Sequence, residues 1–202
     1  MIKLNLFSKV VLMDRLNLSI NDLQQINQKV KNEKYVDVKE TYSTKISKSL
    51  YVLDSLDNIK NLILDKFLNI NNTYFKYDND FKITTSWFTK SSKNNLGDFH
   101  NHGNNFYSGI YYIDVDDDTG DIEFSDFTPS NYTLDTREFN VDNSKSWRVK
   151  PENDLIIFFP SEMYHKIHLN KSEKIRYSLA FNIFPVGRIG YGDNIINTSE
   201  VK

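Results

Sequence analysis

The sequence lacks cysteine, has no large excess of charge of either sign, and contains no long hydrophobic run. Without cysteine, disulfides and thiolate metal sites are excluded, and any metal must be bound by His, Asp or Glu. The 27 acidic and 25 basic residues nearly cancel, giving a net charge of -2. The chain therefore lacks the electrostatic footprint of a protein that binds duplex nucleic acid or an anionic membrane.

The N-terminal stretch MIKLNLFSKVVLM is interrupted by Lys3, Asn5 and Lys9. These polar residues break the continuous apolar core that a signal peptide or a membrane span requires. We therefore expect a cytoplasmic protein without a membrane partner, located in the host cytoplasm if its origin is viral.

The chain is long enough to bury one substantial core, with 202 residues of which 39% are hydrophobic and 14% aromatic. We expect a single domain over residues 1–202, with a helical N-terminal portion (1–75), a β-rich core (81–186) and a C-terminal tail (187–202). The sequence contains no internal repeat and leaves the existence of a homo-oligomer open.

Two segments of the first third have helical periodicity. Apolar residues recur at spacings of three and four in SINDLQQINQKVKNE (19–33), where Ser19 or Asn21 is a candidate N-cap. The pattern is stronger in DSLDNIKNLILDKFLNI (54–70), where Asp54 or Ser55 is the candidate cap. Both segments are expected to be helices that precede the β-rich core.

From about Phe81 onward the pattern changes to short aromatic and β-branched runs separated by polar turns. With seven or eight such runs and no helical signal between them, we expect an antiparallel sandwich or jelly roll. The acid-rich stretch DVDDDTGD (114–121) does not have the spacing of a calcium loop, so we favour a solvated hairpin tip over a calcium site. The runs are FKITTSWFT, FYSGIYYIDV, GDIEFSDF, SWRV, DLIIFFP, YHKIHL and KIRYSLAFNIF.

All four histidines lie in two short clusters, the first of which is the His-x-His unit of His100 and His102. On a strand, residues i and i+2 project from the same face, so two such imidazoles reach one point in space, as a metal requires. The alternative interpretation is a pair of polar residues on an exposed face, which an isolated His-x-His indicates more often. The first cluster alone therefore does not decide between the two.

The second cluster contains His165 and His168 and follows a buried strand and a Pro-Ser turn, in IIFFPSEMYHKIHL. A strand so distant in sequence can lie beside the first cluster in a Greek-key jelly roll. Because His165 and His168 have opposite parity, only one of them faces the same interior if the strand is regular. We choose His165, which follows the turn closely, and expect His168 at the surface or behind the metal ligands.

A third candidate, Arg176, lies in KIRYSLAFNIFP. Apolar side chains alternate there, so Arg176, Ser178 and Asn182 occupy the opposite face, which is small and polar. If that face lines the interior, the buried guanidinium needs an anionic partner, because leaving it unpaired costs several kcal/mol. The partner is either a protein carboxylate in a structural ion pair or a ligand carboxylate bound through two hydrogen bonds.

The order of these segments, His-x-His, SGIYYI, FPSEMYHKI and RYSLAFN, resembles the 2-oxoglutarate and iron(II) dependent oxygenases over roughly Thr84 to Pro185, in particular a branch found in marine bacteria and phages. The resemblance implies a mainly β fold, the double-stranded β-helix (a cupin-like jelly roll), with the N-terminal helices packed on the outside. It implies Fe(II), 2-oxoglutarate as cosubstrate and dioxygen as cofactors. In that family iron is held by His-x-Asp or His-x-Glu and a distal His, and an Arg beyond that His binds the distal carboxylate of 2-oxoglutarate.

By this similarity, the metal ligands are His100, His102 and His165. The cosubstrate is held by Arg176 and Ser178, with a further hydrogen bond from Tyr112. No catalytic residue beyond the metal ligands is implied.

One departure from the family concerns His102, which stands where the family has Asp or Glu. The branch mentioned above also tends to carry His-x-His, and a three-histidine site leaves the metal more positive and open to zinc or copper as well. Other registers remain open, since Asp98 shares the strand parity of His100, and His102-Gly103-Asn104 can be read as a degenerate His-x-Asp.

The implied reaction couples oxidative decarboxylation of 2-oxoglutarate, to succinate and carbon dioxide, to hydroxylation of a substrate C–H bond. The prime substrate is not identified by the sequence, and we expect a small molecule or a protein side chain rather than duplex nucleic acid. Two alternatives are a non-catalytic, cupin-like metal- or ligand-binding module and a jelly-roll structural protein of a virion. We expect the aromatic residues Trp87, Phe106, Tyr107 and Tyr111 to belong to the core.

Overall fold

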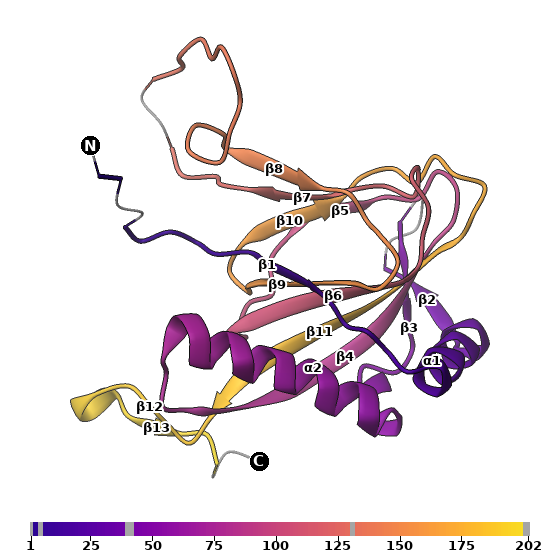
Figure 1. The fold of residues 1–202 in the computed structure, drawn as a ribbon, viewed down its shortest axis with the longest axis horizontal. Helices are drawn as coiled ribbons and strands as arrows, with labels where there is room; N and C mark the ends of the chain where they lie inside the picture. The colour runs from indigo at the N-terminus through magenta and orange to yellow at the C-terminus, as the bar shows by residue number, and fades with distance from the viewer. Residues whose placement is uncertain (1, 4–5, 39–42, 130–131, 200–202) are drawn as a thin grey trace.

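The computed structural model describes residues 2–3, 6–38, 43–129 and 132–199. Eight consecutive strands, β4 to β11, are divided equally between two antiparallel sheets that face each other (Figure 1), with β7 and β8 as neighbours in the same sheet. The large sheet has the order β1-β9-β6-β11-β4-β3-β2 and the small sheet the order β5-β10-β7-β8. The eight strands are β4 (Asp80–Ser91), β5 (Gly97–His100), β6 (Tyr107–Asp114), β7 (Ile122–Ser125), β8 (Ser146–Val149), β9 (Leu155–Pro160), β10 (Tyr164–Ile167) and β11 (Arg176–Val186).

This arrangement confirms the jelly roll, or double-stranded β-helix, that the sequence predicted. Each predicted run from FKITTSWFT to KIRYSLAFNIF contains or overlaps one strand, and SWRV corresponds to β8 residue for residue. The exception is β5, a short strand that ends at His100 and that no predicted run covered. The acid-rich stretch is the turn between β6 and β7, where the carboxylate of Asp117 lies 3.0 Å from Lys150 Nζ.

Additional strands lie outside this β core. Strands β1 (Leu12–Arg15), β2 (Tyr35–Asp37) and β3 (Lys45–Ser47) extend the large sheet at its two edges, and β12 (Arg188–Ile189) pairs with β13 (Ile196–Asn197) in a separate hairpin. The sequence analysis did not predict these strands. The N-terminal 75 residues are therefore not only helical.

The two predicted helices are present as α1 (Ile20–Asn32) and α2 (Asp57–Ile70). Ser19 caps α1, since its side chain accepts a hydrogen bond from the backbone N–H of Asp22. The predicted cap of α2 was wrong. A 3-10 helix occupies Val52–Ser55, and α2 starts after Leu56, which makes no side-chain cap hydrogen bond.

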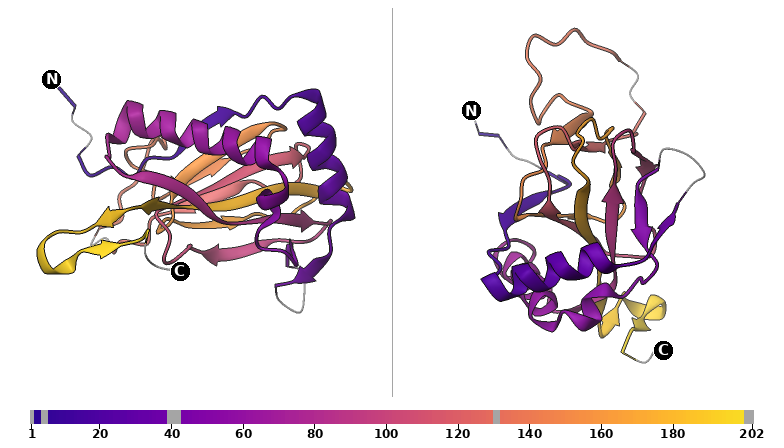
Figure 2. Two further views of the ribbon diagram at one scale, coloured as in Figure 1. Left: turned by 90° about the horizontal axis from the view of Figure 1, so that it is seen from below. Right: turned by 90° about the vertical axis from the view of Figure 1, so that its right-hand side faces the viewer.

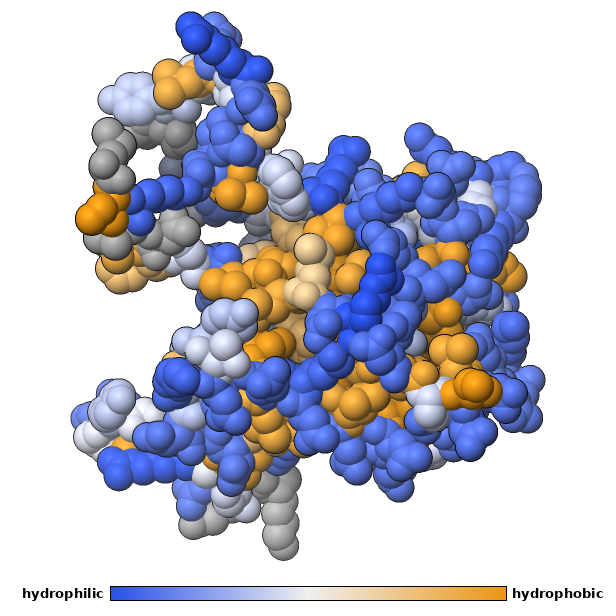
Figure 3. Space-filling view, in the orientation of Figure 1, coloured by the Kyte–Doolittle hydropathy of each residue, from blue (hydrophilic) through white to orange (hydrophobic). Residues whose placement is uncertain are grey.

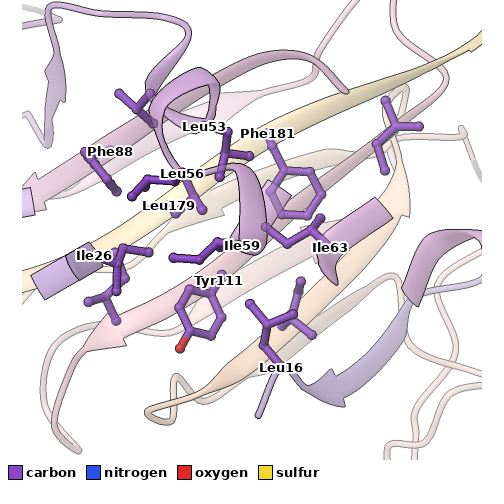
Figure 4. Packing of buried hydrophobic residues seen from close by; sticks show 14 of the residues in the cluster. Leu16, Ile26, Leu53, Leu56, Ile59, Ile63, Phe88, Tyr111, Leu179 and Phe181 are labelled. Carbon is purple, nitrogen blue, oxygen red and sulfur yellow. The ribbon is translucent and has the colours of Figure 1, made fainter. Parts of the chain in front are cut away.

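Helix α2 lies across the outer face of the large sheet, and α1 packs beside it (Figure 2). Ile59 and Ile63 of α2 point toward Tyr111, Leu179 and Phe181 of the sheet, as Figure 4 shows. All five side chains are fully buried, so burial of apolar surface between helix and sheet stabilises this layer. No helix among the described residues is long and apolar enough to cross a membrane.

A second core fills the space between the two sheets. On β6, Tyr111 and Ile113 face the helices, whereas Ile110 and Tyr112 face the small sheet, as the period of two in a strand requires. On β11, Leu179 faces the helices. The inner surface of β11 therefore carries the polar residues of even number, beginning with Arg176, and it faces the strands that carry the histidines.

Candidate metal centre and anion-binding pocket

Three histidines from three separate stretches of the chain meet at one end of the space between the sheets. His100 ends β5 and is the register partner of His165, the second residue of β10. The ring centroid of His165 lies 4.4 Å from that of His100 and 5.1 Å from that of His102. One nitrogen from each ring lies within 4.8 Å of the other two, and within the described ranges this is the group of His, Asp or Glu side chains suited to a metal ion.

Hydrogen bonds define which nitrogen each ring offers. The Nδ1 of His100 lies 2.8 Å from the carbonyl oxygen of Asp98, and the Nδ1 of His165 lies 3.0 Å from that of Met163. A carbonyl oxygen only accepts, so both rings carry their proton on Nδ1 and leave the Nε2 lone pair free. Such an acceptor behind the ring is the usual support of a metal-bound histidine.

Burial keeps the imidazoles of His102 and His165 neutral. The side chain of His165 is only 4% exposed, and burial, aided by the neighbouring His100, lowers its pKa to about 3. Burial also lowers the pKa of His102, against the opposing effect of its hydrogen bond with Asn182. Because a metal binds the unprotonated ring, two of the three candidate ligands are held in the binding form across the neutral range.

The local reason for the His-x-His geometry differs from the prediction. Strand β5 ends at His100, so His102 is not on the strand, and the parity argument does not account for its position. The backbone N–H of His102 instead donates to the carbonyl oxygen of Ser161, at 2.8 Å, in the turn that precedes β10. This long-range bond brings the residue to the same site as His165.

The remaining histidine, His168, lies away from this site. Its Nε2 is 2.6 Å from the Glu123 carboxylate, which also accepts from Arg148 and lies 3.8 Å from Lys166. Glu123 neighbours Phe124 on β7, whose side chain faces the inner core, so the Glu123 cluster is on the outer surface of the small sheet. Of the two positions predicted for His168, the structure shows the surface one. Asp98, the alternative ligand, is not in the metal-suited group.

Arg176 is the deepest charged group of the inner surface, at 2% exposure. Its Nη1 donates to the carbonyl oxygen of Gly120 at 3.1 Å, and its Cζ lies 5.0 Å from the ring centroid of Tyr112. Its Nε has no hydrogen-bond partner, and no carboxylate within the described residues lies at ion-pair distance from it. Burial lowers the pKa of the guanidinium, while the more distant carboxylate of Asp121 acts in the opposite direction. An arginine side chain stays protonated, so a buried positive charge without a direct ion-pair partner faces the space between the sheets.

Two further buried polar atoms share this lack of a partner. The hydroxyl of Tyr112, a fully buried residue, and the Oγ of Ser91 make no hydrogen bond. Ser91 is the register partner of Arg176 on β4, and Tyr112 is that of Ser178 on β6, so the side chains of all four lie on the same inner surface of the large sheet. Burial raises the pKa of Tyr112 to about 12, which keeps its hydroxyl a hydrogen-bond donor.

These donors fit an anion. Leaving buried donors unsatisfied costs about 1 to 3 kcal/mol each, so two hydroxyls and a guanidinium nitrogen without partners indicate a place for a bound acceptor. The Oγ of Ser178 already makes one hydrogen bond, with Thr89 Oγ1 at 2.5 Å. If Ser178 accepts in that bond, its own hydroxyl proton can be donated to the same bound acceptor. The histidines and this pocket together provide three neutral nitrogen donors and a site for a carboxylate.

Several residues of the site were missed by sequence analysis. Asn182 Oδ1 and Ser108 Oγ lie 2.7 and 2.9 Å from the Nδ1 of His102, and Ser91 lies beside Arg176. Trp87, predicted to belong to the core, is only half-buried, and its ring centroid lies 5.5 Å from that of His102. The alternation of Thr85, Trp87, Thr89 and Ser91 along β4 was the available signal for an inner surface.

The histidine end of the barrel is the end from which the β7–β8 loop projects, described over residues 126–129 and 132–145, because this loop follows Ser125, the register partner of Tyr164. Figure 3 shows this loop and the β12–β13 hairpin on either side of a hollow whose wall carries both hydrophobic and polar residues. A separate concavity of about 1180 Å³ lies within the loop itself and is lined only by loop residues. Because its walls contain none of the histidines, we place the candidate chemistry at the barrel end.

Comparisons with known proteins agree with this geometry. Residues 85–182 match the family model described as "putative 2OG-Fe(II) oxygenase". No curated protein matches the chain.

Solved structures of similar fold include HygX from Streptomyces hygroscopicus, with nickel, 2-oxoglutarate and hygromycin B bound. The two sequences are 10% identical, the TM-score is 0.61, and the alignment covers 87% of this chain and 82% of HygX. A Pseudomonas putida prolyl-4-hydroxylase has 15% identity and a TM-score of 0.60, and the alignment covers 88% of this chain and 93% of the hydroxylase. The carbocyclase SnoK of nogalamycin biosynthesis has 10% identity and a TM-score of 0.65, and the alignment covers 92% of this chain and 84% of SnoK. These likenesses show a shared fold. The match to the 2OG-Fe(II) oxygenase family covers residues 85–182, the segment that contains the three clustered histidines and Arg176.

Proposed function

We propose that the protein is a 2-oxoglutarate and Fe(II) dependent oxygenase in which His100, His102 and His165 bind the metal. The observation that carries the proposal is the buried Arg176, whose positive charge has no carboxylate partner among the described residues and lies on the inner surface that the histidines also face. A site that only held a metal would have no need of this cation.

The chain's own residues bind and orient the cosubstrate. Arg176 is proposed to hold the distal carboxylate of 2-oxoglutarate, together with Ser178 and the hydroxyl of Tyr112. Ser91 is a further donor that we add on the basis of its unpartnered Oγ. Since these groups are almost completely buried, they also exclude water from that end of the site.

The metal, 2-oxoglutarate and dioxygen supply the oxidative chemistry, in which decarboxylation of 2-oxoglutarate is coupled to oxidation of a substrate C–H bond. The three imidazoles provide neutral donors in place of the two histidines and one carboxylate of the family. Such a ligand set leaves more positive charge on the metal and is also suited to other transition metals, so metal identity is part of the test.

The prime substrate is proposed to be a small molecule or a protein side chain. HygX, of the same fold, is bound to hygromycin B, and the Pseudomonas putida protein is a prolyl-4-hydroxylase. The hollow at the histidine end of the barrel is the proposed entrance (Figure 3). The near-balance of charge gives no support to duplex nucleic acid as the substrate.

The test is anaerobic absorption spectroscopy of the protein with Fe(II), followed by addition of 2-oxoglutarate. We expect a weak visible charge-transfer band that appears only when both are present. A metal-binding module without turnover would bind Fe(II) and give no band with 2-oxoglutarate, and a structural jelly roll would bind neither.

A further inference from the structure

The ring of His102 is held differently from the other two candidate ligands. His100 and His165 donate to main-chain carbonyl oxygens, whereas the Nδ1 of His102 faces two side chains. It lies 2.7 Å from Asn182 Oδ1 and 2.9 Å from Ser108 Oγ. The orientation of His102 therefore depends on residues that a substitution can change, and this makes its support testable.

Asn182 is itself fixed by its surroundings. It lies within β11, only 6% exposed, with Ser108 of β6 and Thr85 of β4 as its register partners on either side. Its Nδ2 donates to Thr85 Oγ1 at 2.9 Å, and the hydroxyl of Ser108 donates to its Oδ1 at 2.8 Å. With the amide nitrogen used on one side, the amide oxygen is turned toward His102.

The chain of hydrogen bonds continues one step further. The Oγ of Ser108 lies 2.7 Å from the Oγ of Ser161, whose main-chain carbonyl oxygen accepts from the backbone N–H of His102. Ser161 is completely buried, as is Ser108. Backbone and ring of His102 are thus held by one connected group of polar residues, with Asn182 in contact with the ring.

We propose that Asn182 is the positioning residue of the metal site: its Oδ1 accepts the Nδ1 proton of His102 and thereby directs the Nε2 lone pair at the metal. The inference rests on the proposed function, because it takes His102 to be a ligand. A neutral imidazole can carry its proton on either nitrogen, and a ring protonated on Nε2 cannot bind a metal through that atom. Asn182 removes this alternative while adding no charge to the site.

The first test is the tautomer of His102 in the metal-free protein, measured by ¹⁵N NMR of the imidazole nitrogens. In the wild-type protein we expect the Nδ1-protonated form, as in His100 and His165. In Asn182→Ala we expect His102 alone to become a mixture of tautomers. A wild-type His102 protonated on Nε2 would overturn the proposal without reference to any variant.

The second test is the affinity for Co(II), measured by titration calorimetry and by the visible spectrum of the bound ion. Loss of a hydrogen-bonding partner behind a metal-bound histidine lowers metal affinity by about 10-fold to 100-fold, and we expect this loss in Asn182→Ala. Asn182→Asp accepts the same hydrogen bond and cannot donate one, so it should bind Co(II) at least as tightly as the wild type. If Asn182→Asp loses as much affinity as Asn182→Ala, the amide oxygen is not the group that faces His102.

Asn71 provides a matched control, because it is also a buried asparagine whose amide makes two hydrogen bonds, to the backbone of Tyr77 after α2. Asn71→Ala should lower the melting temperature and leave the tautomer and the Co(II) affinity unchanged. An equal loss of affinity in Asn71→Ala would assign the effect of Asn182 to general destabilisation and overturn the proposal.

These experiments distinguish failure of the proposed oxygenase function from failure of the proposed role of Asn182. A wild-type protein that binds Co(II) but shows no binding of 2-oxoglutarate contradicts the proposed oxygenase, while the tautomer and the two Asn182 variants still decide the role of Asn182. A wild-type protein without affinity for Co(II) overturns both. Unchanged tautomer and affinity in Asn182→Ala overturn the positioning role alone.

Discussion

His165 and His100 are direct register partners across the β10–β5 pair, with their ring centroids 4.4 Å apart. They are 65 positions apart in the numbering, and only the antiparallel pairing of two short strands brings them together. The candidate metal centre therefore depends on the register of the small sheet, and its two strand ligands, His100 and His165, cannot be replaced by residues one position away, because these point to the other surface.

The first prediction compares two histidines of the same short segment. His165→Ala removes a candidate ligand and should lower Co(II) affinity by more than the roughly 100-fold that loss of an outer partner causes. His168→Ala removes an imidazole that pairs with Glu123 on the outer surface, and it should leave Co(II) affinity unchanged while lowering the melting temperature. Calorimetric titration of both variants with Co(II) checks this, and similar losses in the two would refute the ligand assignment.

A second prediction uses the unpartnered hydroxyl of Tyr112. Tyr112→Phe removes a buried donor without a protein partner, so the free energy of unfolding of the ligand-free protein should stay the same or rise. Affinity for 2-oxoglutarate should fall by roughly 10-fold to 100-fold if the hydroxyl bonds the carboxylate. Calorimetric titration with 2-oxoglutarate, with Mn(II) as a redox-inert metal, measures the affinity. Ser91→Ala should likewise leave the free energy of unfolding the same or raise it, and lower the affinity for 2-oxoglutarate.

Tyr111 is the matched control for Tyr112, because it is the next residue of β6 and points to the helices. Its hydroxyl donates to Asp154 Oδ1 at 3.3 Å. Tyr111→Phe should therefore lower stability and leave 2-oxoglutarate affinity unchanged. If Tyr112→Phe behaves like Tyr111→Phe, the hydroxyl of Tyr112 has a structural role and the pocket assignment fails for this residue.

The strands could be predicted from the sequence where their two faces differ in character. In β11, Leu179 and Phe181 pack under α2 while Arg176, Ser178 and Asn182 face inward, and this alternation is legible in the sequence because one face is apolar and the other small and polar. His165 lies on β10 in the metal-suited group, whereas His168 follows the end of that strand at Ile167, so the parity argument does not account for its position. The family resemblance is confirmed for residues 85–182, and the branch of marine bacteria and phages stays a prediction.

The support of the site could not be predicted, because it depends on contacts between distant segments. His102 lies beyond the end of β5 and is held by the backbone of Ser161, and its ring partner Asn182 comes from β11. No local pattern reveals which of the polar residues of a strand meets which histidine. The start of α2 was mispredicted because Asp54 and Ser55 belong to a separate 3-10 helix that precedes it.

A third prediction concerns acid stability and the Glu123 carboxylate, whose side chain is 9% exposed. Burial raises its pKa, but hydrogen bonds from His168 and Arg148 outweigh this effect, and the net result is a pKa below the ordinary 4.5. A carboxyl group with a lowered pKa in the folded state stabilises the protein above the unfolded pKa, and this stability is lost as the pH falls through the folded pKa.

Glu123→Gln should accordingly be less stable than the wild type at pH 7, by roughly 1 to 3 kcal/mol. The difference should shrink as the pH falls below about 4.5, because the wild-type carboxylate becomes protonated there. Urea unfolding of both proteins between pH 3 and pH 7 measures the difference. A gap that is constant over this range would mean that the charge of Glu123 does not contribute.

The last prediction concerns Arg176, because this residue separates an oxygenase from a generic metal site. Arg176→Lys keeps the positive charge and loses the two-pronged geometry, so 2-oxoglutarate affinity should fall by roughly 10-fold to 100-fold, the value of one charge-assisted hydrogen bond, while metal affinity changes little. Arg176→Leu should bind 2-oxoglutarate still more weakly, since the carboxylate would enter a buried pocket without a counter-charge. Because no carboxylate of the described residues forms an ion pair with Arg176, Arg176→Leu also removes a buried charge that is offset only by the Gly120 carbonyl, the Tyr112 ring and the more distant Asp121, and its ligand-free form should unfold at a temperature no lower than the wild type. A structural ion pair would give the opposite pattern, with lower melting temperatures in both variants and unchanged 2-oxoglutarate affinity. Calorimetric titration with 2-oxoglutarate in the presence of Mn(II), together with thermal unfolding of the ligand-free variants, distinguishes the two, and unchanged affinity in a folded Arg176→Leu protein would remove the principal residue-level support for the oxygenase.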